Sequence, residues 1–246
     1  MMDVHCHMLP AIDDGPDSME ESLSMARHAV EAGFSHVILT PHILPGAYDN
    51  DAAGIAKTFA EFESELRANG IPLSISMAAE VRVCGELPEM IAADTVPFLG
   101  LWQGRRALLL EWPFDAAPIG FERLIAWLLA RDIVPVVAHP ERNKDIILNP
   151  EKIGHYVQLG CLFQITGSSV TGLFGKASQA CALFLLYRDW VAFIATDAHN
   201  MHKRSPSLVD ARRMLQALIG IPNTRRLFDN AHGLIPTGFT SLGLIK

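Results

Sequence analysis

Two histidines lie one residue apart near the start of the chain, in the short apolar stretch DVHCH. Side chains of a β-strand alternate between its two faces, so His5 and His7 point to one face and Cys6 to the other. Imidazole is the commonest metal ligand in proteins, but a histidine pair at a strand end is also found as ordinary hydrogen-bonded structure. The rest of the chain must decide between these two interpretations.

Metal-capable side chains also end most of the other short apolar segments that we expect to be strands. Together with the first pair they make nine candidate ligands: His5, His7, Asp14, His42, Glu80, Glu111, His139, Asp197 and His199. Mixed imidazole and carboxylate donors suit zinc, manganese or iron rather than calcium. Nine ligands exceed the needs of one ion, so two or three ions are expected if some carboxylates bridge. A purely structural explanation of the whole set is disfavoured, because buried charges without cations or partners are costly.

Several polar residues near this pattern are interpreted differently. Asp13 lies in IDDGPDS and is interpreted as a turn residue beside the candidate ligand Asp14. Five histidines fall on expected helices or loops and are given no role in a site: His28, His36, His155, His202 and His232.

Two arginines follow candidate ligands closely. Arg142 lies in HPERN and Arg204 in DAHNMHKR. A guanidinium offers paired donors that match the oxygens of a phosphoryl group, so an arginine beside a metal cluster suggests a phosphate ester as substrate. A surface salt bridge is the alternative for either arginine alone. Arg82 lies two residues after Glu80 and could orient that carboxylate.

The cysteines argue against thiol chemistry. Cys6, Cys84, Cys161 and Cys181 are far apart and form no C-x-x-C pair. None is followed six residues later by the arginine that the loop of a cysteine-based phosphatase requires. We therefore expect buried free thiols.

Seven apolar segments are expected to position these residues as strands: DVHCH, HVILTPH, LSISMAAEV, ALLLEWP, VPVVAHP, LFQITGS and VAFIATDAH. They are nearly continuous in Val, Ile, Leu and Ala, as is typical of parallel strands covered on both faces. We expect one domain over residues 1–246, built as a single β/α barrel of about seven strands, with an open doubly wound sheet as the alternative. In such barrels the carboxyl ends of the strands converge on one mouth, which would bring the candidate ligands together.

Helix signals separate these segments. Ser18 with Glu21 forms a capping box ahead of an apolar-periodic stretch. Asn149 predicts the start of another helix, and Gly160 predicts its end. Further helices are expected around residues 52–69, 119–131, 174–189 and 207–218.

Composition excludes several classes of protein. Half of the residues are hydrophobic and 19% are charged, which is typical of a globular chain. The formal net charge of −7 argues against nucleic acid as the main partner. The most apolar stretch, CALFLLYRDWVAFIA, is interrupted by Arg188 and Asp189, so no membrane span is expected. Asp3 and His5 follow the first methionines directly and leave no room for a signal peptide, so a cytoplasmic location is expected.

The stretch DVHCHMLPAIDDGPDSMEESLSMARHAVEAGFSHVILTPH resembles the start of the bacterial PHP-type tyrosine phosphatases of capsule and exopolysaccharide synthesis. The later segments AAEVR, LLLEWP, VAHPERN, QITGSSVTG and ATDAHN follow in the order of that family, so the resemblance covers nearly the whole chain. It implies a distorted seven-stranded β/α barrel with up to three metal ions, usually manganese. The same nine residues would be its ligands, and Arg142 and Arg204 would contact phosphate.

The resemblance also implies a substrate. The family acts on phosphotyrosine, often on the tail of a membrane-bound tyrosine kinase that controls polysaccharide chain length. The stretch ILPGAYDN lacks the histidine or basic residues common in relatives, and Thr166 stands where an asparagine is frequent. Neither difference removes a ligand, but the first could alter the loop that faces the substrate.

These observations predict metal-assisted hydrolysis of a phosphate monoester, with charge neutralisation by the cations and arginines. His199 or Asp197 could assist as an acid, and the residues do not decide between them. Three alternatives stay open at this point. The first is a phosphoesterase acting on histidinol phosphate, a sugar phosphate or a nucleotide. The others are a metal-dependent amidohydrolase, which no lysine at an expected strand end supports, and a non-catalytic binding module.

Overall fold

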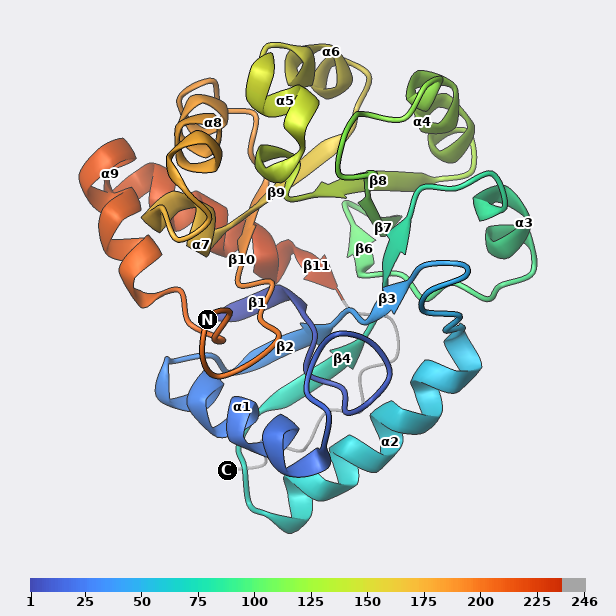
Figure 1. Ribbon diagram of the computed structural model, residues 1–246, viewed down its shortest axis with the longest axis vertical. Coiled ribbons are helices and arrows are strands. Elements are labelled where there is room, and N and C mark those ends of the chain that lie inside the picture. Colours follow the sequence, from blue (N-terminus) through green and yellow to red (C-terminus); the bar gives the residue numbers. More distant parts are fainter. Residues whose placement is uncertain (236–246) are drawn as a thin grey trace.

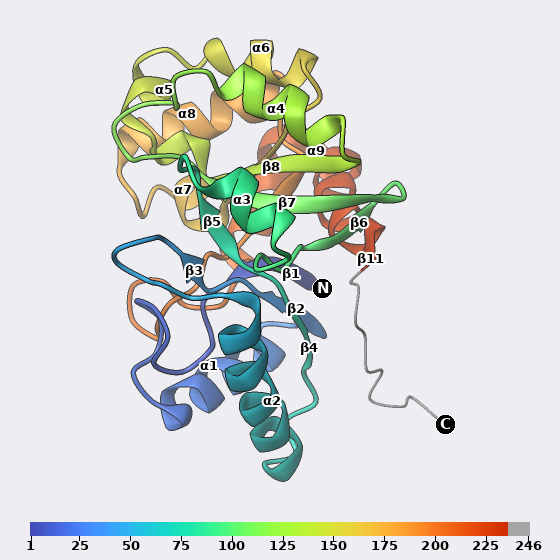
Figure 2. The ribbon, with the colours of Figure 1, turned by 90° about the vertical axis from the view of Figure 1, so that its right-hand side faces the viewer.

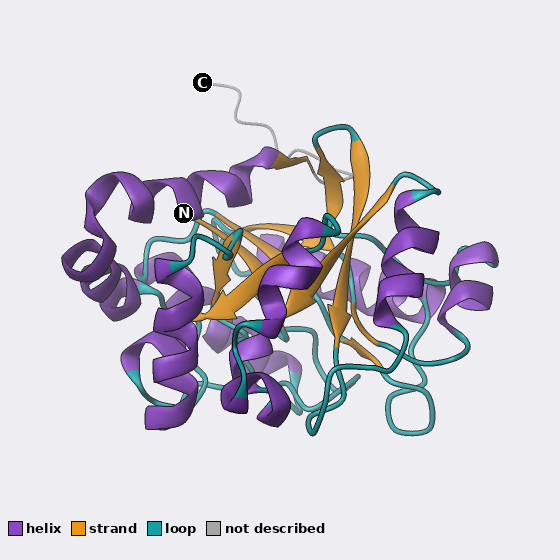
Figure 3. Cartoon of the chain, turned by 90° about the horizontal axis from the view of Figure 1, so that it is seen from above, coloured by secondary structure: helices purple, strands orange, loops and turns teal. Residues whose placement is uncertain are grey.

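Strands form the centre of the molecule and helices surround them, as Figures 1 and 3 show for residues 1–235 of a computed structural model. The strands are β1 (Met2–Cys6), β2 (His36–Leu39), β3 (His42–Ile43), β4 (Ser74–Met77), β5 (Glu80–Arg82), β6 (Gly100–Trp102), β7 (Arg105–Glu111), β8 (Ile133–Ala138), β9 (Leu162–Thr166), β10 (Phe193–Ala195) and β11 (Leu234–Ile235). The helices are α1 (Met19–Glu31), α2 (Ala52–Ala68), α3 (Leu87–Ala92), α4 (Phe121–Leu129), α5 (Lys144–Leu148), α6 (Lys152–Gln158), α7 (Gly167–Thr171), α8 (Lys176–Tyr187) and α9 (Val209–Gly233), with a 3₁₀ turn at Pro140–Arg142. None of these helices is long and apolar enough to cross a membrane.

The strands pair largely in chain order. β1, β2 and β4 form a three-stranded parallel sheet, which lies with α1 and α2 in the lower half of Figure 2. The second sheet has eight strands, and its main path runs β10-β9-β8-β7-β5-β3 with parallel pairs. This order contains no reversal, so it does not fit an open doubly wound sheet. The α/β architecture with parallel strands is confirmed.

The ring of strands is distorted rather than closed by continuous ladders. The segment that follows β10 meets β1 through an isolated bridge between Ala198 and Cys6. The backbone N–H of His7 donates to Ala198 O at 2.8 Å, and that of Asp197 donates to His5 O at 2.9 Å. Two of the seven expected strands are each divided into two short ones. The first division lies at Pro41, which has no N–H to donate to a neighbouring strand. The second lies at Ala78 and Ala79.

Side chains of the central strands are buried on both faces. In β7, Ala107 and Leu109 belong to an inner cluster, while Leu108 and Leu110 pack in the larger cluster between strands and helices. All four are essentially inaccessible to solvent. This explains why the strand is a continuous apolar run in the sequence.

Most expected helices are present, with differences at their ends. The side chain of Ser18 caps α1 by accepting from Glu21 N at 3.3 Å, but the Glu21 carboxylate accepts from Asp17 N instead of returning to Ser18. The expected cap at Asn149 is wrong, because Asn149 ends α5, a helix that the sequence did not predict. The segment 174–189 contains α8, and 207–218 is the start of the longer α9, which bends at Gly220.

His36 at the start of β2 lies away from the strand ends that carry the candidate ligands, and its ring nitrogen is 2.7 Å from Ser76 Oγ. Burial, with a smaller effect of His232, lowers the pKa of His36 to about 4 from 6.5. Between pH 4 and pH 6.5, His36 is protonated in the unfolded chain but largely neutral in the native chain. The free energy of unfolding therefore falls as the pH falls through this range. We expect this loss to reach about 2 kcal/mol at pH 4.

Urea unfolding of the metal-free wild type and His36→Gln at pH 7 and pH 4.5 measures this effect. The other titrating groups are the same in both proteins, so their contribution cancels when the two changes in the free energy of unfolding are compared. His155→Gln, at a half-exposed histidine, is the matched control and should follow the wild type. Parallel changes in wild type and His36→Gln would contradict the prediction.

Candidate metal centre

The structure brings all nine predicted ligands into one cluster at the carboxyl ends of the strands. His5 is the second-last residue of β1, and Glu111 is the last residue of β7. His42 and Glu80 are the first residues of β3 and β5. The other five ligands lie in the loops that follow β1, β8 and β10. Three groups each have donor atoms within 4.8 Å of one another: His7, Asp14, His42 and His199; His5, His7, Glu80 and Asp197; and His42, Glu80 and Glu111. His139 joins through Nε2, which lies 2.7 Å from Glu80 Oε1.

Unusual backbone conformations turn two of these side chains into the centre. His139 and Asp197 have φ values of 32° and 52°, in the left-handed region that non-glycine residues rarely adopt. Such strain is common at functional sites, where the surrounding structure maintains it. Gly15 lies so close to β1 that an added Cβ would be 2.7 Å from the carbonyl oxygen of His7. This close approach lets the loop place Asp14 over the cluster.

His5 and His7 have the ring orientation of metal ligands. His5 Nδ1 lies 2.8 Å from Gln164 Oε1, and His7 Nδ1 lies 2.7 Å from Asp13 Oδ2. Each Nδ1 therefore carries the proton that it donates, and each Nε2 presents a lone pair. The two Nε2 atoms are only 3.1 Å apart, so in the neutral form neither can satisfy the other. A cation between them would satisfy both.

Distances around His5 agree with this interpretation. Its Nε2 lies 3.2 Å from Glu80 Oε2 and 3.3 Å from Asp197 Oδ1. Ligand atoms that share an ion at about 2.0–2.2 Å lie about 3–3.5 Å apart. Four buried atoms in the cluster make no hydrogen bond to the described residues: His42 Nδ1, Glu80 Oε2, Asp197 Oδ1 and His199 Nε2. Orphaned buried donors and acceptors are rare in proteins, and here they converge on the same centre.

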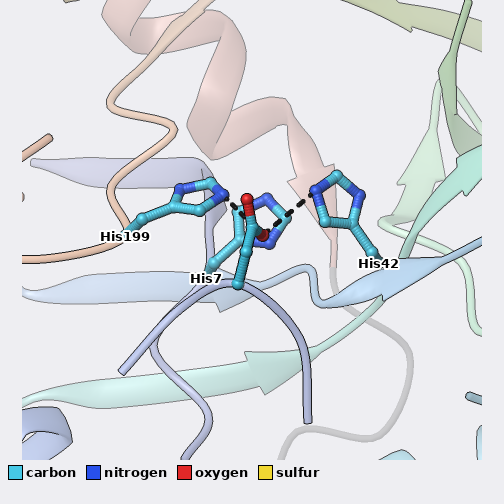
Figure 4. Close-up of side chains that lie close together, drawn as sticks. His7, His42 and His199 are labelled. Carbon is cyan, nitrogen blue, oxygen red and sulfur yellow. Dashed lines mark ion pairs between the residues drawn. The ribbon is translucent and has the colours of Figure 1, made fainter. Parts of the chain in front are cut away.

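Figure 4 shows His42 and His199 on either side of a carboxylate, with His7 close by. That carboxylate belongs to Asp14, whose Oδ1 lies 3.4 Å from His42 Nε2 and 3.1 Å from His199 Nε2. The His7 and His199 rings stack with centroids 3.9 Å apart. Asp14 is more exposed than the other ligands, so this part of the centre is open to solvent.

Charge in the cluster is strongly coupled. Burial opposes ionisation of Glu80, but His5, His139 and His42 outweigh it and hold the pKa of Glu80 well below its usual range. Burial also lowers the pKa of His7, yet Asp13 and Glu80 overcome this and raise it to about 10. Without a cation, protons on His5 and His7 therefore balance part of the charge of the carboxylates. A divalent cation would replace those protons.

Both predicted arginines contact one carboxylate. Arg142 Nη1 and Arg204 Nη2 each donate to Asp197 Oδ2 at 2.5 Å, while Oδ1 of the same residue faces His5 and His7. Burial raises the pKa of Asp197, but His5, Arg204 and other cations outweigh it and hold that pKa well below its usual range. The two guanidiniums thus lie directly beside the candidate metal ligands.

Arg82 contacts a different carboxylate from the one that was predicted. It was expected to orient Glu80, but its Nε donates to Glu111 Oε2 at 2.9 Å, and its Nη2 forms an ion pair with the same oxygen at 2.8 Å. Glu80 is held instead by His139. Arg82 and Glu111 come from neighbouring strands, and parallel pairing places them directly opposite each other. This register was not visible in the sequence.

Two residues that hold ligands were missed. Asp13 was interpreted as a turn residue, and it does accept from Gly15 N at 3.0 Å, but it also orients His7 and accepts from His42 N at 3.0 Å. Gln164 orients His5 from the middle of β9. The histidines that Asp13 and Gln164 orient lie on other elements, so no local pattern shows these contacts. Only the alternation of side chains along β9, which turns Gln164 inward, could have indicated one of the two residues.

The cysteines have the expected character. Cys6, Cys161 and Cys181 are buried and Cys84 is partly buried, and all four are free. Burial raises the pKa of Cys181 to about 12, and it also raises the pKa of Cys6 and Cys161. None of these thiols is poised to act as a nucleophile.

Replacing Asp13 by asparagine tests its role in holding His7. An amide cannot accept from His7, His42 and Gly15 together, because one of its two polar atoms is a donor. We expect the affinity for Mn²⁺ to fall about 10-fold to 100-fold, as is typical when a partner of a ligating histidine is lost. Calorimetric Mn²⁺ titration measures this, with the exposed Asp229→Asn as control. Unchanged affinity in Asp13→Asn would show that Asp13 serves only the turn.

Comparison with known proteins places the chain in a family. Residues 1–236 match the family model described as capsular polysaccharide synthesis, CpsB/CapC. The chain is 36% identical over 235 residues to the tyrosine-protein phosphatase YwqE of Bacillus subtilis (strain 168), covering 96% of this chain and 91% of the relative. A chain from the crystal structures of YwqE from Bacillus subtilis and CpsB from Streptococcus pneumoniae, called unique metal-dependent tyrosine phosphatases, superposes with a TM-score of 0.90 at 35% identity, covering 97% of this chain and 96% of that one.

A more distant structure supports the fold alone. The phosphotriesterase homology protein from Escherichia coli aligns with a TM-score of 0.56 at 13% identity, over 93% of this chain and 95% of the other. The family match covers all of the described residues and agrees with the relative and the solved structure. The chain belongs to the CpsB/CapC family of capsular polysaccharide synthesis.

Proposed function

We propose that this protein is a metal-dependent tyrosine-protein phosphatase that hydrolyses phosphotyrosine in capsule or exopolysaccharide synthesis. One observation carries the proposal: eight imidazole and carboxylate side chains converge at the strand ends and His139 joins them through Glu80, with two guanidiniums on the carboxylate of Asp197. The names of the relatives support the same activity. The arginines favour phosphate over other substrates of metal hydrolases.

We propose that the nine residues hold two or three divalent ions, with manganese first and zinc or iron as alternatives. The donors are nitrogen and oxygen only, which suits these metals. Glu80 would help to hold more than one ion, because its Oε2 lies within 3.3 Å of donor atoms of His5, His7 and His42. Bound ions would supply charge neutralisation and lower the pKa of coordinated water toward neutrality.

The chain's own residues bind the phosphoryl group and hold the ligands in place. Arg142 and Arg204 have N–H groups left over from their bonds to Asp197, and in the proposed role these donate to phosphoryl oxygens where charge accumulates. Asp13 and Gln164 hold His7 and His5 in the tautomer that presents Nε2. No covalent intermediate on the chain is required.

The leaving group places a modest demand on proton transfer. A tyrosyl phenolate has a pKa near 10, so it departs with less protonation than an alkyl alcohol needs. Asp197 is a poor acid, because nearby cations hold its pKa well below its usual range. Burial and the charge of His7 lower the pKa of His199 to about 4, so it too is unprotonated at neutral pH. We propose that the phenolate leaves without a proton from either residue.

The proposed partner is a phosphotyrosine-containing protein, with the tail of a membrane-bound tyrosine kinase of polysaccharide chain length as the first candidate. This rests on the family and on the sequence resemblance. The net charge of −7 supports a protein partner over nucleic acid. We propose that the enzyme acts in the cytoplasm.

A metal-reconstitution assay tests the activity. The chelated protein should lose hydrolysis of p-nitrophenyl phosphate and phosphotyrosyl peptide and regain it with Mn²⁺, and thiol alkylation should leave it unchanged. Turnover of histidinol phosphate, a sugar phosphate and a nucleotide should be much slower. A strong preference for one of these metabolites would overturn the substrate, and lack of any metal-restored hydrolysis would overturn the activity.

A further inference from the structure

Phe114 is an exposed aromatic side chain three residues after the end of β7, and 58% of its surface is accessible to solvent. Together with Glu111, His139 and Arg142 it lines a hollow of about 30 Å³, which is room for about one water molecule. Phe114 therefore lies at the edge of the candidate metal centre. An aromatic ring is too large for the hollow, so the ring of an aryl phosphate bound at the centre stays outside it, where Phe114 is accessible.

Two hydrogen bonds tie the loop of Phe114 to the turn that carries Arg142. Asn143 Nδ2 donates to Pro113 O at 2.8 Å, and the backbone N–H of Lys144 donates to Phe114 O at 3.1 Å. Asn143 and Lys144 directly follow Arg142 in the chain, and the buried Asn143 also caps α5. The position of the Phe114 ring is thus fixed relative to a guanidinium that is proposed to bind phosphate.

One charged side chain lies over the Phe114 ring. Lys144 Nζ is 5.0 Å from the ring centroid and also pairs with Asp115 Oδ1 at 2.7 Å. Lys144 and Asp115 are both exposed, and more than half of the Phe114 surface stays accessible beside them. A planar ring has two faces, so a contact on one side leaves room for a second ring.

Two other aromatic side chains contact residues of the centre, but they have less free surface. The Phe174 ring lies under the guanidinium of Arg142, with Cζ 4.7 Å from the ring centroid. The Tyr48 ring stacks on His42 with centroids 5.6 Å apart. Both are partly buried, so Phe114 offers the most accessible aromatic surface of the three.

The larger opening beside the centre suits an aromatic ring less well. This cavity, between α1 and the loop that follows β10, measures about 560 Å³. Apart from Met201, its accessible side chains are mainly polar or charged: Asp14, Asp17, Glu21, Ser24, Asn200, His202 and Lys203. A ring placed there would take water from polar groups without replacing their hydrogen bonds, which is costly. Contact with Phe114 carries no such cost.

We propose that Phe114 packs against the aromatic ring of the substrate, so that the enzyme binds aryl phosphates more tightly than alkyl phosphates. The inference rests on the proposed function and assigns to it a residue that distinguishes phosphotyrosine from aliphatic phosphate esters. Aromatic pairs with centroids about 4.5–7 Å apart are stabilised beyond the burial of their surface. This selectivity in binding adds to the easier departure of a phenolate in the chemical step.

Phosphonates test the proposal, because their P–C bond is not hydrolysed and their affinity reports binding alone. Calorimetry on the Mn²⁺-loaded wild type should give a dissociation constant about tenfold lower for phenylphosphonate than for methylphosphonate. Phe114→Ala should remove this preference by raising the phenylphosphonate constant about tenfold. The constants for methylphosphonate, inorganic phosphate and Mn²⁺ should change less than twofold. Phe114→Tyr keeps the ring and should keep the preference.

Two control variants locate the effect. Ile119→Ala removes a fully exposed apolar side chain from the same loop, outside the hollow, and should behave as the wild type. Ser24→Trp narrows the larger cavity from α1 and should also keep the preference. Loss of the preference in Ser24→Trp would place the ring in that cavity and overturn the proposal.

Three other results would also overturn the role of Phe114. These are equal phosphonate constants in the wild type, an unchanged preference in Phe114→Ala, and an equal rise of all three anion constants in that variant, which would indicate a purely structural role. Hydrolysis of p-nitrophenyl phosphate by the same Mn²⁺-loaded wild type is measured separately. Its absence would overturn the proposed function itself.

Discussion

Replacement of Glu80 by glutamine is expected to reduce hydrolysis of p-nitrophenyl phosphate at least about a thousandfold, which corresponds to about 4 kcal/mol of transition-state stabilisation. Glu80 is fully buried, and its Oε2 lies 3.2 Å from His5 Nε2, 3.3 Å from His7 Nε2 and 3.2 Å from His42 Nδ1. Its other oxygen is 2.7 Å from His139 Nε2. No other carboxylate among the described residues belongs to two of the three donor groups.

The physical reason is loss of a shared negative charge. A glutamine keeps the shape of the side chain but not the charge that would neutralise cations on both sides, and its amide nitrogen cannot coordinate as a carboxylate oxygen does. We therefore expect the metal content of Glu80→Gln to fall together with its activity. Elemental analysis after dialysis, with the rate measured on the same sample, tests both effects.

Glu61→Gln provides a matched control, because Glu61 is exposed on α2 and far from the strand ends in sequence. It should keep the full metal content and rate. Circular dichroism of Glu80→Gln should match the wild type, which separates loss of metal from loss of fold. A folded Glu80→Gln with full metal content and a rate within tenfold of wild type would contradict the role of Glu80.

The positions of most candidate ligands were predictable because they follow a simple local rule, whereas Asp14 lies in the long loop after β1. Glu111 and His139 stand where an apolar run ends, and parallel strands carry such residues to one edge. To apply this rule one must know only that the strands run parallel and that their middle residues are buried. Continuous apolar runs such as Leu108–Leu110 indicate both. It succeeds without knowing which strands are neighbours.

Residues that orient the ligands follow no such rule. Asp13 and Asp14 are neighbours of the same type, and only the folded loop shows that Asp13 turns to His7 while Asp14 faces His42 and His199. Arg82 pairs with Glu111 rather than Glu80 because of the register between β5 and β7. Hydrogen bonds between distant segments depend on packing, which no local pattern encodes.

The same limit applies to the fold. The turn at Gln103 and Gly104 has positive φ at both residues and makes a hairpin of β6 and β7, which the sequence analysis missed. β11 was also missed, because it pairs with β6 about 130 residues earlier in the chain. Pairing over such a distance is decided by the rest of the fold.

Arg142→Ala and Arg204→Ala are each expected to lower kcat/KM for p-nitrophenyl phosphate roughly a hundredfold, within the range that phosphate-binding arginines contribute to phosphoryl transfer. Each side chain donates to Asp197 Oδ2 at 2.5 Å and keeps further N–H groups for a phosphoryl oxygen. Lysine should restore only part of the rate, because an ammonium cannot make paired bonds to a carboxylate and a phosphate.

Two roles of the arginines can be separated by experiment: binding of the phosphoryl group, and holding the carboxylate of Asp197 in place. Because both guanidiniums share one oxygen of Asp197, their effects should not be additive, and Arg142→Ala with Arg204→Ala should lose less than the product of the single losses. If the arginines also bind phosphate, the inhibition constant of inorganic phosphate should rise at least tenfold in each single variant. If they act only by holding Asp197, metal affinity should fall while that constant, measured at saturating Mn²⁺, stays the same.

Arg123→Ala is the matched control, since Arg123 is exposed on α4 and its loss should change neither constant.

Asp197 connects the arginines to the candidate metal ligands, because it faces His5 and His7 through one oxygen and the arginines through the other. A phosphoryl group that draws the guanidiniums toward itself would weaken their hold on Asp197 and make that carboxylate a stronger ligand. We therefore expect bound phosphate to raise the affinity for Mn²⁺ in the wild type and to have a smaller effect in the double variant. Equal effects of phosphate in both proteins would show that the arginines do not connect substrate binding to the metal centre.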